Sequence, residues 1–108
     1  KEKGLPWEKA KAFDHSAVIG NFTSKKLYSS LENINFELQS NGITVQEGNT
    51  SLMLWKIDEL IAYVSRYFTL KIGDIIFTGT PKGVAKVNEG DVLEGFLEGK
   101  PMFKIQIK

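Results

Sequence analysis

The sequence contains no cysteine, and this absence excludes both disulfide bonds and thiolate metal sites. It also lacks any apolar run near the roughly 20 residues that a membrane helix needs, and no signal peptide is visible. A chain without cysteine fits a reducing compartment. We therefore expect a cytoplasmic protein with no membrane partner.

An excess of one charge is also missing. The 108 residues carry 14 basic and 13 acidic side chains, for a net charge of +1. Nucleic-acid-binding domains usually show a basic face, and here the lysines alternate with acids and no aromatic stacking stripe is evident. A nucleic-acid partner is therefore disfavoured. The chain begins at Lys1 with a charged stretch rather than with methionine, so we expect a fragment of a longer protein.

The apolar pattern predicts about five strands and one main helix. Alternation predicts half-buried strands, and apolar residues spaced three and four apart predict a helix. The expected elements are a helical turn in 4–13, an extended segment at 14–22, strands at 33–40, 43–46, 75–78, 92–98 and 102–108, and a helix through Ile57, Leu60, Ile61, Val64 and Phe68. The fold class is α+β, a mixed, mainly antiparallel β-roll with one main packed helix.

Turn residues separate these elements. Asn41-Gly42 is the strongest short hairpin signal in the chain. "KIGD" (71–74) and "NEGD" (88–91) predict two turns of one kind, and Gly99-Lys100-Pro101 predicts another. The loop at 47–55 offers caps at Asn49, Thr50 or Ser51.

The stretch "GDIIFTGTPKGV" (73–84) opens as a strand and closes as a glycine-rich loop. A phosphate-binding P-loop requires a Gly-Lys-Ser/Thr ending, and here Val84 follows Lys82-Gly83, so that interpretation fails. Threonine hydroxyls beside glycine-freed backbone N–H groups can hold a carboxylate. An ordinary strand-end turn uses the same residues, and spacing alone favours the turn.

Other candidate groups are weaker. His15 is the only histidine and has no orienting partner at a suitable spacing, so a solvated or hydrogen-bonded role is favoured over catalysis. Lys9 and Lys11 lie between Trp7 and Phe13, where either a partly buried cation or a solvated side chain is possible. The acidic residues are scattered and form no complete metal site.

Four motifs read together resemble one family. "KGLPWEKAKAFD" (3–14), "QEGNTSLM" (46–53), "GDIIFTGTPKGV" (73–84) and "GDVLEG" (90–95) are similar, in this order, to the C-terminal half of the fumarylacetoacetate hydrolase family. The resemblance spans essentially the whole chain. It is strongest to short acylpyruvase, oxaloacetate decarboxylase-like and 2-hydroxyhepta-2,4-diene-1,7-dioate isomerase-like members.

The resemblance implies a mixed β-roll in a homodimer. It implies a Mg²⁺ or Mn²⁺ ion that chelates a small 2-oxo or 1,3-dicarbonyl acid and stabilises the enolate formed as a C–C bond breaks or as enol and keto forms interconvert. A His–Glu pair activates water in the hydrolytic members. The expected function is therefore hydrolase, decarboxylase or isomerase chemistry, which this half of the sequence does not separate.

The resemblance also assigns residues. Lys11 matches a lysine beside the metal that faces the substrate oxygens, so it is the expected catalytic and substrate-binding cation. Thr80 matches the threonine whose hydroxyl and neighbouring amides hold the substrate carboxylate, and Gly79 lets the backbone approach closely. Gln46, Gly48 and Thr50 match a segment expected to shape a loop and cap it rather than to catalyse.

The metal ligands and the His–Glu pair of the family lie upstream of Lys1, and His15 and Val18 depart from the family pattern. We therefore expect residues 1–108 to form a single domain, the C-terminal part of a catalytic domain whose N-terminal part is missing from this chain. The parent protein is the expected enzyme, and the chain alone should be inactive. The alternative is a non-catalytic β-roll module that binds a small carboxylate.

Overall fold

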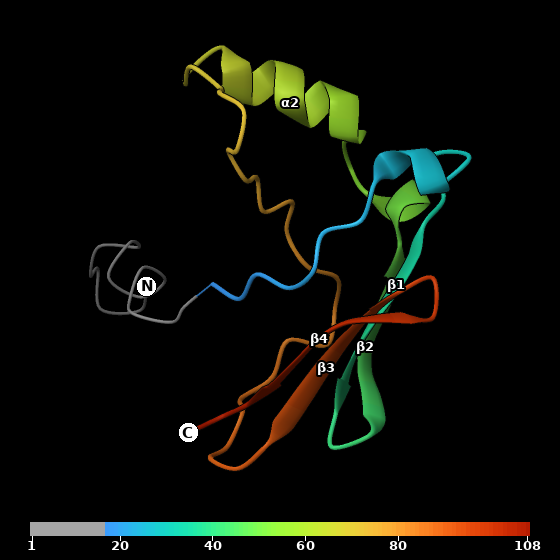
Figure 1. Cartoon of the computed structure of the whole chain (residues 1–108), viewed down its shortest axis with the longest axis vertical. Coiled ribbons are helices and arrows are strands. Elements are labelled where there is room, and N and C mark those ends of the chain that lie inside the picture. Colours follow the sequence, from blue (N-terminus) through green and yellow to red (C-terminus); the bar gives the residue numbers. More distant parts are fainter. Residues whose placement is uncertain (1–16) are drawn as a thin grey trace.

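The computed structural model describes residues 17–108 as a four-stranded antiparallel sheet and one α-helix (Figure 1). The expected helical turn in 4–13 and the start of the segment at 14–22 lie outside the described residues. The strand order is β2-β1-β3-β4. The elements are η1 (Lys25–Leu27), β1 (Asn35–Ser40), β2 (Ile43–Asn49), η2 (Thr50–Leu52), α2 (Ile57–Ser65), β3 (Val92–Leu97) and β4 (Lys100–Gln106).

The β1–β2 hairpin forms where the Asn-Gly signal predicts it. Asn41 and Gly42 both have positive φ angles, 52° and 82°, which the favoured two-residue hairpin turn requires. The strand β2 runs three residues further than expected, and its register contains a bulge. Leu38 pairs with Gln46 while Gln39 pairs with Thr44, so Val45 has no partner in the ladder. Bulges of this kind redirect neighbouring side chains.

The turn between β3 and β4 lies one residue earlier than predicted. It consists of Glu98 and Gly99, with φ angles of 51° and 77°. Two hydrogen bonds hold Glu98 in this conformation. Its backbone N–H donates to Asn35 O at 2.8 Å, and its Oε1 accepts from Asn35 N at 3.0 Å. Pro101 therefore belongs to β4, which tolerates proline because it is an edge strand.

The two Gly-Asp turns have the same pattern of hydrogen bonds, as their similar sequences suggest. In each turn the aspartate carboxylate accepts the backbone N–H three residues earlier, at 2.8 Å from Lys71 to Asp74 and at 2.8 Å from Asn88 to Asp91. Asp91 makes a further contact, because Asn41 Nδ2 donates to its Oδ1 at 3.0 Å. The start of β3 is thereby fastened to the β1–β2 hairpin.

We expect Asp91→Asn to lower the melting temperature at neutral pH more than Asp74→Asn does. The Asn88 N–H, and after it the Asn41 amide, hold the pKa of the Asp91 carboxyl below its ordinary value of 3.8. A lowered pKa in the folded state means that this carboxylate stabilises the fold above its ordinary pKa. That stability is lost as the pH falls through the lower, folded-state value.

The difference in melting temperature between wild type and Asp91→Asn should therefore shrink on acidification, which circular dichroism melts between about pH 7 and about pH 3 can measure. A difference that stayed constant over this range would contradict the assignment. Asp74→Asn is the matched comparison, because Asp74 accepts the same turn hydrogen bond without the Asn41 contact.

The helix α2 begins where its apolar pattern starts and ends at Ser65, short of the predicted Phe68. Glu59 Oε1 accepts the backbone N–H of Lys56 at 3.3 Å and so satisfies one donor before the first turn. The predicted packing of the helix on the sheet is not found. No residue of α2 is buried, and the helix stands beyond the end of the sheet (Figure 1).

The strand expected at 75–78 is the clearest wrong prediction. Residues 74–88 form neither helix nor strand and run as one long connection from α2 towards β3 (Figure 1). Ile75, Ile76 and Phe77 form a continuous apolar run, which is typical of a strand covered on both faces. A strand needs a hydrogen-bonded neighbour, and none of the described residues supplies one.

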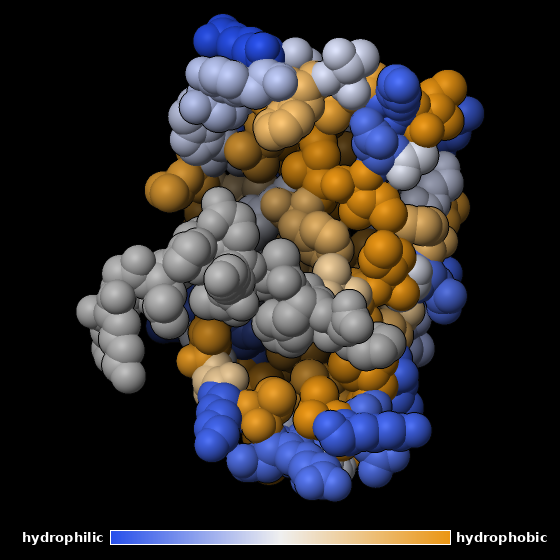
Figure 2. All heavy atoms as spheres, turned by 90° about the vertical axis from the view of Figure 1, so that its left-hand side faces the viewer, coloured by the Kyte–Doolittle hydropathy of each residue, from blue (hydrophilic) through white to orange (hydrophobic). Residues whose placement is uncertain are grey.

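The core of the described residues is correspondingly small. Among residues 17–108, Ile34 is the one large apolar side chain that is buried, at 5% exposure, while Phe22 is 78% and Leu54 100% exposed. Figure 2 shows apolar side chains spread over much of one face. The described residues thus expose many large apolar side chains of the type that proteins bury.

Candidate functional site

The loop at 79–83 is held against the bulged part of β2. Gln46 Nε2 donates to Thr80 Oγ1 at 2.9 Å and to Pro81 O at 2.9 Å. These two contacts join residues 34 and 35 positions apart in the sequence. The strand β2 is at the edge of the sheet, and this loop therefore lies beside the sheet through side-chain contacts rather than through a backbone ladder.

Gly83 anchors the other end of the loop. A Cβ atom at this position would lie 2.5 Å from Val45 O and 3.0 Å from Gln46 Cγ, so the backbone approaches β2 more closely than a side chain permits. The φ angle of Gly83 is 108°, a left-handed conformation that also favours glycine. The contact falls on the unpaired residue of the bulge, Val45. The bulge and the glycine together determine where the loop lies.

Gly79 and Thr80 line an open hollow of about 400 Å³ between the loop and the sheet. The φ angle of Gly79 is 99°, and the space around the position of a Cβ there is free. The opposite wall of the hollow is largely apolar and comes from three strands, with Phe36 and Leu38 of β1, Phe96 of β3 and Phe103 of β4. A threonine hydroxyl therefore meets an apolar surface here, an arrangement that suits a small molecule with one polar end.

Gly83→Ala should destabilise the protein more than Gly79→Ala. Both substitutions force a left-handed φ on a residue with a Cβ, which costs about 1–3 kcal/mol. Only the alanine at 83 also meets Val45 O, at 2.5 Å. Urea denaturation measures the two free energies of unfolding, and limited proteolysis within 79–83 shows whether the loop has left β2. Equal effects on both readouts would argue against close docking of Gly83.

The structure places the predicted site residues as follows. Gly79 and Thr80 line the hollow together, whereas Lys11 and His15 lie outside the described residues. Thr50 Oγ1 accepts the backbone N–H of Ile34 at 2.9 Å, a shaping role of the kind expected for its segment. The direct contact of Gln46 with Thr80 was not predicted, and the sequence carries no local signal for it.

The ring of Phe36 lies against Gly48, where a Cβ would be 2.7 Å from the ring. Another aromatic ring, that of Phe103, covers Gly95 in the same way and leaves no room for a Cβ. Glycine at these two positions leaves room for rings that form walls of the hollow. The apolar wall was not part of the predicted site, because it is assembled from three separate strands.

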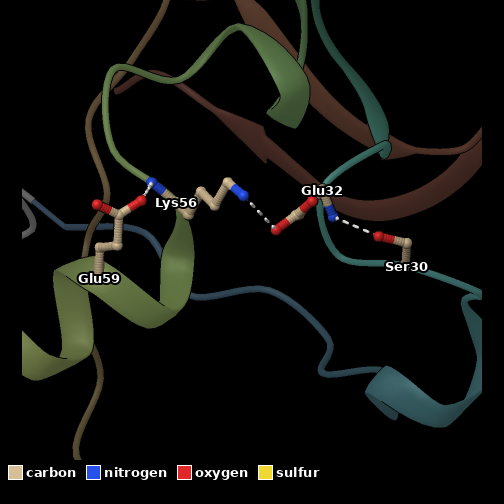
Figure 3. Close-up of polar contacts among 4 residues, drawn as sticks. All are labelled: Ser30, Glu32, Lys56 and Glu59. Atoms are coloured by element: carbon tan, nitrogen blue, oxygen red, sulfur yellow. Dashed lines mark hydrogen bonds and ion pairs between the residues drawn. The ribbon is translucent and has the colours of Figure 1, made fainter.

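A second hollow, of about 270 Å³, lies between η2 and the start of α2. Lys56 Nζ is 3.4 Å from Glu32 Oε1 across it, and Figure 3 shows Glu59 turned towards the backbone of Lys56. Both partners of this ion pair are exposed, and such a pair contributes about 0–1 kcal/mol to stability. Thr50, expected only to shape its segment, lines this hollow, whereas Gly79 and Thr80 do not, so the candidate site is the one beside Thr80.

The described residues do not fit a metal ion. Within 17–108, no three side chains of histidine, cysteine, aspartate or glutamate gather at one place. No helix of this part of the chain is long and apolar enough to cross a membrane.

A family model described as the fumarylacetoacetate (FAA) hydrolase C-terminal domain matches residues 1–107. The chain belongs to the fumarylacetoacetate hydrolase family. It is 42% identical over 108 residues to the mitochondrial oxaloacetate tautomerase of Bos taurus, covering 100% of this chain and 49% of that one. It is 44% identical over 100 residues to the oxaloacetate tautomerase YcgM of Escherichia coli, covering 92% and 46%. The chain thus spans about half the length of the curated relatives it matches.

Solved structures of the family share the fold. A fumarylacetoacetate hydrolase family protein from Yersinia pestis superposes with a TM-score of 0.90 at 43% identity, covering 99% of this chain and 50% of that one. Fumarylpyruvate hydrolase from Pseudomonas aeruginosa, in complex with Mn²⁺ and pyruvate, gives a TM-score of 0.88 at 35% identity, covering 98% and 46%. The expected α+β fold with one main helix is therefore confirmed at the level of the family.

Proposed function

We propose that this chain is the carboxylate-binding half of an enzyme that acts on small 2-oxo or 1,3-dicarbonyl acids. The observation that carries the proposal is the placement of Gly79 and Thr80 in a hollow whose opposite wall is largely apolar, with Glu37 as its one acidic residue. A carboxylate would lie against the Thr80 hydroxyl and the backbone N–H groups of the loop, with the carbon skeleton against the rings. The relatives support the substrate class, since their names give oxaloacetate tautomerase and fumarylpyruvate hydrolase.

The reaction is proposed to be tautomerisation, decarboxylation or hydrolysis through an enolate of the oxo acid. Thr80 and Gly79 would hold the carboxylate in one orientation, which fixes the position of the reacting carbon. Lys11 would place a positive charge near the substrate oxygens and so offset the negative charge that develops there. In this proposal the loop binds the substrate carboxylate, and Lys11 stabilises the negative charge that develops on the substrate oxygens.

A divalent cation, Mg²⁺ or Mn²⁺, is proposed for the whole protein, because the fumarylpyruvate hydrolase structure contains Mn²⁺. Its ligands would lie outside the described residues, which hold no suitable cluster. The large uncovered surface also supports a second segment of similar length, packed on this one within the whole protein. A homodimer and a cytoplasmic location complete the proposal, although the bovine relative is mitochondrial by name.

A non-catalytic module that binds a small carboxylate is the second candidate. One observation favours it: the loop and its hollow are formed by residues of this chain alone. The two candidates differ in what the isolated chain should do. A module should be a well-behaved monomer that binds a carboxylate, whereas half of an enzyme should associate through its apolar face and bind weakly.

The experiment that tests the proposal compares the isolated chain with the full-length protein. Full-length protein should turn over oxaloacetate and bind oxalate in the presence of Mn²⁺. The isolated chain should do neither in activity assays and calorimetric titrations, and should elute as aggregates or oligomers in size-exclusion chromatography. Micromolar binding of Mn²⁺ and oxalate to a monomeric isolated chain would contradict the proposal and favour the module.

A further inference from the structure

The side chain of Gln46 uses both of its N–H groups on the loop. One is donated to Thr80 Oγ1 and the other to Pro81 O, each at 2.9 Å. A backbone carbonyl can only accept a hydrogen bond, so the Pro81 contact requires the nitrogen of the amide, not its oxygen, to face the loop. The orientation of the Gln46 amide is therefore fixed by its partners rather than free to flip.

This orientation restricts the directions in which the Thr80 hydroxyl can donate its proton. A hydroxyl has one proton to donate and two lone pairs that accept. Gln46 occupies one lone pair, and among the described residues Thr80 Oγ1 donates to no acceptor. The proton of Thr80 is thus left for a partner in the hollow that Thr80 lines. An anion is the partner that a lone O–H donor favours most.

We propose that Gln46 is a positioning residue that holds the Thr80 hydroxyl as a hydrogen-bond donor to the substrate carboxylate. The inference rests on the proposed function of the loop and extends it by one residue. Gln46 itself is poorly suited to touch the carboxylate. Both of its donors are engaged, and the remaining oxygen would repel an anion. Its effect on substrate binding must therefore pass through Thr80.

The fold supplies the geometry that this role requires. Val45 is left out of the ladder with β1, and the chain on either side of it bends. Gly83 then lies on Val45 O, where no side chain would fit. The loop is held by this contact at one end and by the Gln46 amide nearer its start. A hydroxyl with two such supports keeps its direction without the entropy loss that a freely rotating group suffers on binding.

The test uses the full-length protein with oxaloacetate and four variants, which are compared with wild type and with the single variant Thr80→Val. Gln46→Glu removes both donors and substitutes acceptors, which repel Pro81 O and attract the Thr80 proton away from the substrate. We expect its KM to rise about 10- to 100-fold with kcat within a few-fold. Gln46→Met removes the donors but leaves the hydroxyl free to rotate, so its KM should rise only about 3- to 10-fold.

Two further variants complete the design. Gln106→Glu adds the same charge at an exposed position of β4 and should leave KM within about two-fold of wild type. The double variant Gln46→Met with Thr80→Val should be no more than about two-fold worse than Thr80→Val alone, because the hydroxyl through which Gln46 acts is already gone. Melting temperatures are recorded for every variant to separate loss of folding from loss of binding.

Several results would overturn the inference. Equal rises in KM for the Glu and Met variants would show that Gln46 only holds the loop in place. If the KM rises of the two single variants multiply in the double variant, Gln46 acts independently of Thr80. If Gln46→Glu fails to fold, the cycle of Gln46→Met with Thr80→Val still decides, because it does not use that variant. A wild-type protein that neither turns over oxaloacetate nor binds oxalate would overturn the proposed function together with this inference, whereas an active wild type with an unaltered Gln46→Glu variant overturns the inference alone.

Discussion

Thr80→Val in the full-length protein is expected to raise KM for a 2-oxo acid about 10- to 100-fold and to leave kcat within a few-fold. Removing the hydroxyl removes one hydrogen bond to a charged group, which is worth about 1.5–3 kcal/mol. A carboxylate that is not itself lost in the reaction carries its charge before, during and after the reaction. The lost contact therefore weakens ground state and transition state alike, and such a loss is measured in KM.

Two controls sharpen this expectation. Thr78→Val removes a hydroxyl two residues earlier on the same loop, at a position that does not line the hollow, and should behave as wild type. Thr80→Ser keeps the hydroxyl and should recover most of the affinity. Steady-state kinetics with oxaloacetate measure all three variants. A fall in kcat with an unchanged KM for Thr80→Val would place Thr80 at the reacting atoms instead of at the carboxylate.

Short-range features of this fold could be predicted from the sequence because their causes are local. The Asn41-Gly42 hairpin follows from two positive φ angles that these residues tolerate well. The two Gly-Asp turns follow from an aspartate that accepts the backbone N–H three residues earlier. The cap at Asn49 also exists, but it stands at the start of η2 rather than of α2. Asn49 Oδ1 accepts the Ser51 N–H at 2.8 Å.

The strand expected at 75–78 failed because a strand is defined by a neighbour. Its apolar run is a sound signal for burial on two faces, and the described residues offer neither a ladder nor a covering layer. The helix α2 likewise has the apolar pattern of a helix packed against a core, yet none of its residues is buried. Both failures concern segments that find no partner among the described residues, and they agree with the many exposed large apolar side chains there.

The candidate site was predictable in part. Gly79 and Thr80 were found through resemblance to a family, and their residue types alone favoured a plain turn. Gln46 came from the same resemblance as a shaping residue, yet its two bonds to the loop span more than 30 positions of the chain. No periodicity or motif spacing in the sequence predicts such a contact. A bulge one residue earlier redirects the strand, and that bulge is equally invisible in the sequence.

Lys11→Met in the full-length protein is expected to lower kcat about 10²- to 10³-fold with a much smaller change in KM. A cation that faces an oxygen on which negative charge develops stabilises the transition state more than the bound substrate, and removing one such group costs rates of this order. The effect should thus appear in kcat, in contrast to the KM effect of Thr80→Val. Lys11→Arg keeps the charge in a bulkier group and should retain part of the activity.

Lys9→Met is the matched control, because it removes the same charge two residues away in the same segment. It should leave both kinetic constants within a few-fold of wild type. The resemblance leaves open whether Lys11 offsets the substrate carboxylate or the enolate, and the two constants separate these roles. A rise in KM alone would place Lys11 beside Thr80 at the carboxylate, and the charge stabilisation would then belong to other groups. Equal effects of Lys9→Met and Lys11→Met would remove Lys11 from the site altogether.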